Sequence, residues 1–236
     1  MNRDLVPVSC FFQSLLWASQ FGGPGSRLLH AATKITSFWI LDLPLAVTAL
    51  VLIVLAWGLR RSSSRFLVPV AAMGFTTIVV EVAVFIAFQA NFGYVYGKIP
   101  LLLAAFMAGL VLGAAVGRRR RRPGRADLPL VQAGFVLLLL ATYGTLGGIG
   151  GEPVPFALLA GFGVLSGFLF ITATRLALRD TPHPGLGYGV DLIASFAGAL
   201  LTSALLIPIF GIPALIIRLA VLNALVLLFT LVTPSR

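Results

Sequence analysis

The sequence contains few charged residues, one cysteine and two histidines. Only 10% of its 236 residues are charged, whereas a soluble domain has about 25%. The single Cys10 excludes an internal disulfide and any cysteine-based metal or cluster site within this chain. His30 and His183 both fall outside the long apolar runs, which argues against haem ligated between membrane helices. No cofactor and no metal site is therefore predicted.

Hydrophobic residues, in contrast, make up 59% of the chain. Several apolar runs exceed the roughly 20 residues that a helix needs to cross the hydrocarbon core of a bilayer. The sequence therefore predicts an all-α, polytopic transmembrane helical bundle with about seven spans and transporter-like packing. The spans are expected at about 39–59, 66–90, 97–117, 128–149, 154–178, 187–209 and 212–232.

The first 38 residues differ from the rest. The apolar run Val6–Phe21 is short for a span, and Gly22–Gly25 interrupts it. Residues 1–38 are predicted to form an interfacial, amphipathic segment, with a re-entrant or spanning segment as the alternative. No removable signal peptide is expected. The transmembrane bundle is assigned to residues 39–236.

The net charge of +10 comes from clustered arginines, above all Arg118–Arg122. Clusters at helix ends are typical of cytoplasmic loops and not of a nucleic-acid surface. They place loops 60–65, 118–127 and 175–180, together with the C-terminus, in the cytoplasm. Loops 91–98, 149–155 and 209–213 then face outward, and the lipid bilayer is the first partner.

A weak internal repeat is visible at a separation of ninety residues. Ala104–Leu110 resembles Ala194–Leu200, and Gly-Tyr precedes each segment. Units of three spans would have opposite orientations, as in many transporters, although helices rich in small apolar residues also match by chance. Pro208 and Gly211 are expected to separate the last two spans into a tight hairpin.

Glu81 is the most informative polar residue, because it lies in the middle of an expected span. An acid inside the membrane is costly unless it is paired, hydrated or protonated, so it is a candidate ligand or proton site. Gln89 shares its helix face and Thr77 lies one turn before it. The alternative is a neutral acid that joins helices by hydrogen bonding.

Asp191 begins a stripe of polar and small residues that includes Ser195. The two residues are further ligand candidates, but Asp191 also lies near the cytoplasmic end of its span, where a cation could pair with it. Four residues are candidates for ion pairs or snorkelling near helix ends: Arg175, Arg179, Asp42 and Arg218.

Glycines spaced by four residues predict close helix packing, either within the bundle or at a contact between copies of the chain. These glycines are Gly109, Gly113, Gly117, Gly163 and Gly167. The glycine-rich segment 147–152 is predicted to be a turn, since it joins two spans and lacks the strand and helix of a nucleotide loop. No set of catalytic residues can be assembled, so no self-contained active site is predicted.

The stretch from Gly74 through Glu81 to Ala114, and the stretch from Gly187 through Asp191 to Pro208, resemble the membrane region of bacterial membrane-bound spermidine synthase-like proteins. The segment Asn2–Ser9 with Leu16-Trp17 resembles the part that follows the soluble domain of that family. The resemblance implies a bacterial inner membrane and a Rossmann-like aminopropyltransferase domain outside the part that it covers. No residue here inherits a catalytic role.

Three functions follow from these features. The leading hypothesis is a non-catalytic membrane domain of a spermidine synthase-like protein, which anchors or partners a soluble domain or chain and binds a small amphiphilic or cationic ligand near Glu81. The first alternative is a transporter or half-transporter for a small cation or polyamine. The second is a structural subunit of a larger membrane complex, including a redox one. The expected partners are another chain or a homo-oligomer, and no nucleic acid.

Overall fold

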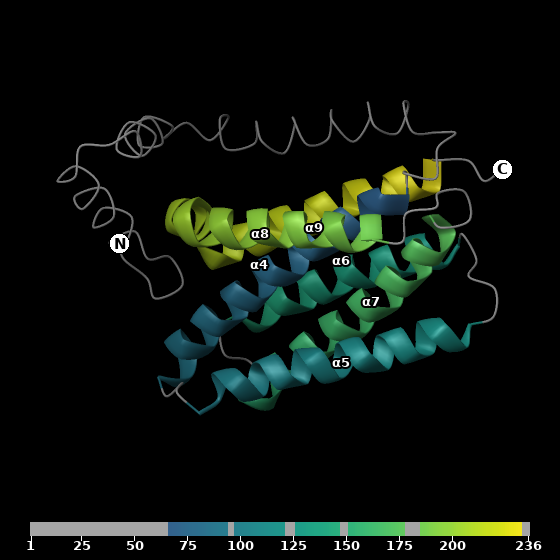
Figure 1. The fold of residues 1–236 in the computed structure, drawn as a ribbon. Coiled ribbons are helices and arrows are strands. Elements are labelled where there is room, and N and C mark those ends of the chain that lie inside the picture. Colours follow the sequence, from purple (N-terminus) through teal and green to yellow (C-terminus); the bar gives the residue numbers. More distant parts are fainter. Residues whose placement is uncertain (1–65, 94–96, 121–125, 147–150, 178–184, 233–236) are drawn as a thin grey trace.

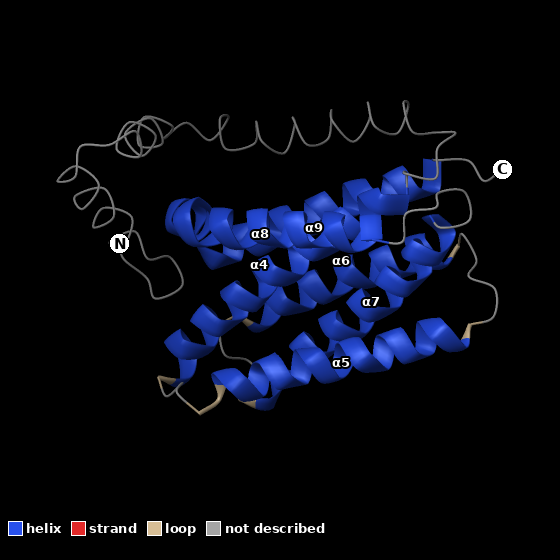
Figure 2. Ribbon diagram, viewed as in Figure 1, coloured by secondary structure: helices blue, strands red, loops and turns tan. Residues whose placement is uncertain are grey.

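The computed structural model describes residues 66–93, 97–120, 126–146, 151–177 and 185–232. Every regular element in these ranges is a helix (Figure 2). In chain order the elements are α4 (Leu67–Phe92), α5 (Ile99–Arg119), α6 (Asp127–Thr145), α7 (Pro153–Ala177), α8 (Gly185–Leu201), the π-helix η2 (Thr202–Leu206) and α9 (Ile207–Val232), as Figure 1 shows.

Six helical segments are long and apolar enough to cross a membrane. They overlap the six spans expected from residue 66 onward, and the prediction of an all-α fold is confirmed for the described residues. The expected span 39–59 and the N-terminal segment 1–38 lie outside the described residues.

Proline and glycine mark several helix ends. Pro100 occupies the first turn of α5 and Pro153 begins α7, where the missing N–H costs little. α4 ends at Gly93, which has φ 68° and donates its N–H to the Gln89 carbonyl at 3.0 Å. Glycine adopts this left-handed conformation without a Cβ clash.

The boundary between the last two spans differs from the expected hairpin. Pro208 lies within a helix that continues from the π turn, and Gly211 alone leaves helical geometry there, with φ 72° and ψ 165°. α8 then packs on α4, whereas α9 packs on α6 and α4. The break was predicted at the correct glycine, but the tight pairing of the two helices was wrong.

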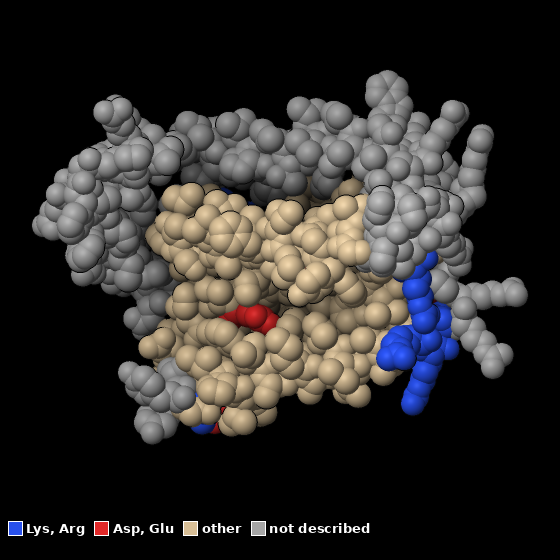
Figure 3. Space-filling model, in the orientation of Figure 1, with Lys and Arg blue, Asp and Glu red and all other residues tan. Residues whose placement is uncertain are grey.

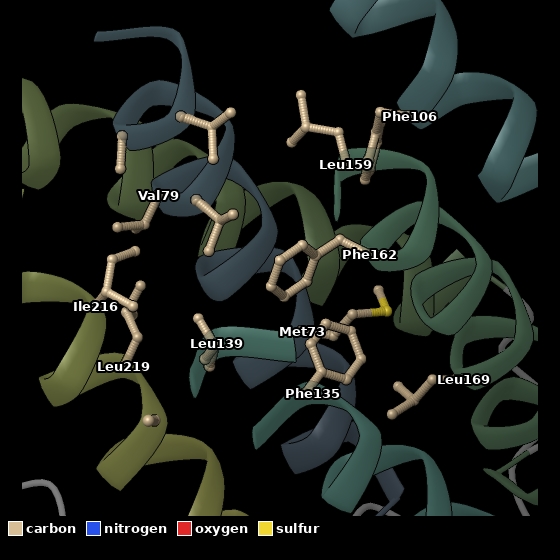
Figure 4. Packing of buried hydrophobic residues seen from close by; sticks show 14 of the residues in the cluster. Met73, Val79, Phe106, Phe135, Leu139, Leu159, Phe162, Leu169, Ile216 and Leu219 are labelled. Carbon is tan, nitrogen blue, oxygen red and sulfur yellow. The ribbon is translucent and has the colours of Figure 1, made fainter. Parts of the chain in front are cut away.

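α4 and α7 form the centre of the bundle (Figure 1). α4 contacts α7, α8 and α9, and α7 contacts α4, α5 and α6. Apolar side chains fill the space between these helices (Figure 4). For example, the buried rings of Phe135 on α6 and Phe162 on α7 have centroids 6.0 Å apart, and Ile216 of α9 is fully buried.

The five glycines predicted to mark close packing all lie between α5 and α7. A Cβ added to Gly109 or Gly113 would collide with the carbonyl of Ala160 or Val164. A Cβ on Gly163 or Gly167 would collide with backbone of α5, and one on Gly117 would lie 3.3 Å from the Ile171 side chain. The partner of each set of glycines, which the sequence left open, is therefore the facing helix of the α5/α7 pair.

The packing pairs keep their pattern when α4, α5 and α6 are exchanged with α7, α8 and α9. The parallel pair α5/α7 corresponds to α8/α4, and α6/α7 corresponds to α9/α4. The pairs α4/α7 and α6/α9 each correspond to themselves. Two groups of three helices thus make equivalent contacts in this part of the chain.

Polar contacts tie both ends of the bundle. At one end, Arg175 donates to the carbonyls of Gly117 (3.1 Å) and Arg120 (3.2 Å), and Arg120 pairs with Asp127 at 2.8 Å. At the other end, Lys98 pairs with Glu152, and Asn91 donates to the carbonyl of Leu146, the residue that follows α6. In the face seen in Figure 3, basic side chains gather at one end and acidic atoms lie in the middle of a largely uncharged surface.

Candidate functional site

Glu81 lies in the middle of the 26-residue helix α4, where its side chain is 8% exposed. Its Oε1 atom is buried and has no hydrogen-bond partner. An unsatisfied carboxyl oxygen in a protein interior is costly, and in lipid no water compensates for the missing contact. The Oε1 atom of Glu81 therefore either binds a ligand or is an unusual unsatisfied polar atom in the core.

Gly74 lies two turns before Glu81 on the same face of α4. The polar residues Asp191 and Ser195 of α8 pack against it. Ser195 donates its hydroxyl hydrogen to the Gly74 carbonyl at 3.1 Å. A Cβ on Gly74 would collide with the carboxylate of Asp191 and would lie 3.0 Å from the Ser195 hydroxyl oxygen. The glycine thus leaves room for the Asp191 carboxylate directly against α4.

The structure brings together some of the predicted site residues and separates others. Asp191 and Ser195 contact α4 at Gly74, and Glu81 follows Gly74 by two turns on the same helix face. Thr77 is buried, but its hydroxyl already donates to the carbonyls of Met73 (2.9 Å) and Gly74 (3.2 Å). Gln89 is exposed near the end of α4, so it does not complete a site at Glu81.

The candidates for ion pairs have varied surroundings. Arg175 contacts carbonyls at the end of α5, and no ion pair joins it to Asp191 within the described residues. Arg218 donates to the Ala214 carbonyl at 3.1 Å, and its guanidinium lies 4.4 Å from the ring centroid of Phe210. Arg179 and Asp42 lie outside the described residues.

A buried hydrogen-bonded chain, which the sequence reasoning missed, joins α6, α9 and α4. Gln132 donates to the side-chain oxygen of Asn223 at 2.6 Å, and Asn223 donates to the hydroxyl of Thr76 at 2.9 Å. All three side chains are fully buried. Amide side chains within apolar runs are a signal in the sequence that could have indicated these bonds. Gln132 and Asn223 are 91 residues apart, and the two segments of the sequence repeat are separated by ninety residues.

Thr202, the first residue of η2, was also missed. It is fully buried, and its hydroxyl oxygen has no hydrogen-bond partner. A π-helix is rare and often lies at a functional site, but a single sequence gives no reliable signal for one.

A small cavity of about 30 Å³ lies between the ends of α4, α6 and α7 that are opposite the arginines. Its lining runs from Val84, one turn after Glu81, to Asn91 and Thr145. A cavity of this volume has room for at least one ordered water molecule.

No group of three or more His, Cys, Asp and Glu side chains that could hold a metal occurs in the described ranges. Comparison with protein-family models, with curated proteins and with solved structures gives no match. The chemistry of Glu81 and its surroundings is therefore the basis for a functional interpretation.

Proposed function

We propose that this chain is an integral membrane protein that binds a small cation at Glu81 and carries it across the bilayer. The observation that carries this proposal is the buried, unpartnered Oε1 atom of Glu81 in the middle of a helix of membrane-spanning length. Ionisable groups at this depth mark ion or substrate pathways more often than structural contacts.

The arrangement of helices supports transport over simple binding. Exchanging α4–α6 with α7–α9 preserves the packing pairs, as expected for an inverted repeat of three helices. In transporters built from such repeats, the binding site lies near the middle of the membrane, between the two units. Glu81 belongs to the first unit, and α8, which packs on its helix, belongs to the second.

A polyamine is the ligand class that this site favours. Gly74, which contacts Asp191, and Glu81 are seven residues apart, or about 10 Å along the helix. The Asp191 carboxylate and Glu81 therefore lie at two depths along α4, which suits a linear molecule with ammonium groups near its two ends. The resemblance of the sequence around Glu81 and Asp191 to spermidine synthase-like membrane regions favours the same class.

Uptake into proteoliposomes tests the proposal. Radiolabelled spermidine should accumulate with the wild-type protein, and Glu81→Gln should reduce the rate at least about tenfold, because the variant loses the buried charge. Glu152→Gln is the matched control, since Glu152 is an exposed carboxylate at a helix end. Equal uptake by wild type and Glu81→Gln would contradict the proposal.

A second candidate is a membrane partner for a soluble aminopropyltransferase domain, as the resemblance implies. Its support is the resemblance of the sequence around Glu81 and Asp191 to the membrane region of that family. Purification from native membranes after mild crosslinking distinguishes the two functions. A stably associated Rossmann-like chain supports the partner role, whereas transport by the isolated protein supports the carrier.

A further inference from the structure

Thr202, like Thr174, has a buried hydroxyl oxygen without a hydrogen-bond partner, unlike three other buried hydroxyl residues of the bundle. The hydroxyls of Thr77, Thr142 and Ser166 each donate to a carbonyl in their own helix, at 2.9, 2.8 and 2.7 Å. Such bonds are the usual way for a Thr or Ser side chain to be satisfied inside a helix. Thr202 is fully buried and makes no such bond. Its hydroxyl is thus available to a ligand.

The packing register places Thr202 at the level of Glu81. α4 and α8 run parallel, because Gly187 approaches Leu67 and Gly198 approaches Ile78. Gly74 lies between Asp191 and Ser195 of α8. Glu81 lies two turns after Gly74 on α4, and Thr202 lies two turns after Ser195, so Glu81 and Thr202 lie at the same level along the two helices.

Two parallel helices can pack in this fold without the Glu81 carboxyl group or the Thr202 hydroxyl. The corresponding pair, α5 with α7, packs closely through glycines against backbone and has no buried carboxylate at its interface. Glu81 and Thr202 are therefore an addition to a contact that apolar and small residues already make in the other unit. This difference between the two units favours a ligand over a structural role.

We propose that Glu81 and Thr202 form an oxygen-lined subsite for one desolvated monovalent cation. One carboxylate balances a single positive charge in a medium of low dielectric constant, and the hydroxyl supplies a neutral oxygen. The change from α to π hydrogen bonding at Thr202 also shifts the backbone carbonyls of this turn out of their usual pattern. Hard cations prefer such oxygen ligands.

An alkali metal ion and the ammonium end of an amine share this chemistry. The proposal rests on the proposed function, since both use Glu81, and it adds Thr202 as a residue that determines ligand affinity. The thermal unfolding midpoint of the purified full-length protein is measured against increasing NaCl, KCl or methylammonium chloride, with choline chloride maintaining ionic strength. The cation that raises the unfolding midpoint is the one that the subsite binds.

Thr202→Val retains the side-chain shape and removes the hydroxyl. We expect it to weaken cation binding roughly tenfold or more, as loss of a contact to a charged group does. Thr142→Val is the matched control, because Thr142 is equally buried and its hydroxyl bonds to its own helix. Glu81→Gln should abolish the cation-dependent shift.

The outcomes separate this inference from the proposed function. Spermidine uptake that depends on Glu81, together with a wild-type cation response in Thr202→Val, overturns the subsite and leaves the carrier standing. A cation response that needs both Glu81 and Thr202, in a protein without uptake, supports the subsite and overturns transport. A wild-type protein that responds to neither alkali ions nor methylammonium overturns the subsite.

Discussion

Gln132 and Asn223 connect α6 and α9 through a buried hydrogen bond of 2.6 Å between their side chains. Asn223 also donates to Thr76 and to the Leu219 carbonyl, so the chain of bonds reaches α4. Gln132 belongs to the first group of three helices and Asn223 to the second, so their bond lies where the two groups meet. The pair is a polar contact between equivalent helices.

Removing either amide should leave its partner buried and unsatisfied. We expect Gln132→Leu and Asn223→Leu each to lower the free energy of unfolding by about 1–3 kcal/mol. The double variant should lose less free energy of unfolding than the two single variants together. The difference, which is the coupling energy, should be about 1 kcal/mol, as for other hydrogen bonds between membrane helices. Unfolding in mixed micelles measures all four proteins, and strictly additive losses would contradict the bond.

The same reasoning distinguishes this amide pair from Glu81. Gln132 and Asn223 bond to each other, so their effect is on stability, and cation uptake should depend on them only through the folded fraction. Glu81 and Thr202 have buried oxygens that the protein itself does not satisfy, and Gln132 also retains one such oxygen, its Oε1 atom. Glu81 is the better place to look for a cation, because its unsatisfied oxygen belongs to a carboxyl group and not to a neutral amide.

At the scale of elements, the interface of α5 with α7 depends on small residues. Gly113→Ala should lower the free energy of unfolding by about 1–3 kcal/mol, because its Cβ would collide with the Val164 carbonyl and force the helices apart. Gly144→Ala is the control, since Gly144 of α6 has nothing within 4 Å of an added Cβ. Alanine there should be neutral or stabilising. Equal midpoints for both variants would contradict close packing at Gly113.

Helix positions could be predicted from the sequence, because apolar runs of membrane length, bounded by Pro153 or Gly93, have few alternatives. Which helices pack together could not, because nearly every face is apolar and lipid satisfies an apolar face as well as protein does. Gly109 and Gly163 predicted a close contact without naming its partner. The expected hairpin at Gly211 failed for this reason, since α4 offers α8 a better surface.

The candidate site was predictable in part. Glu81 and Asp191 could be recognised because a carboxylate in an apolar run is conspicuous, and the structure places them along one pair of helices. Thr202 could not, since threonine is common in membrane helices and only the unmade hydrogen bond distinguishes it. Gln89 and Thr77 share helical spacing with Glu81, but helical spacing does not determine which helix covers a face.

At the scale of the molecule, charge is distributed unequally between the two ends of the bundle. Arg118, Arg119 and Arg120 end α5, and Arg175 lies in the last turn of α7 at the same end. The opposite end has Lys98, which Glu152 neutralises. Positively charged loops remain in the cytoplasm, so the arginine end is expected to face inward.

Labelling of introduced cysteines tests this orientation. The chain has one natural cysteine, so Cys10→Ser gives a background without thiols. A membrane-impermeant maleimide should label Lys98→Cys in intact spheroplasts, and should label Arg119→Cys only after permeabilisation. Loss of the exposed Lys98 ion pair should cost little stability. The reverse pattern would contradict the orientation.

The orientation also sets the order in which a ligand meets the two carboxylates. Asp191 lies near the start of α8, at the arginine end, whereas Glu81 lies deeper in α4. A cation from the cytoplasm would therefore reach Asp191 first and Glu81 about 10 Å further into the membrane. Because a polyamine would contact both carboxylates, Asp191→Asn should slow spermidine uptake into inside-out vesicles, whose outer face is the cytoplasmic one, and should also weaken spermidine binding at equilibrium. A loss of rate without a loss of affinity would instead place Asp191 on the entry path, outside the binding site.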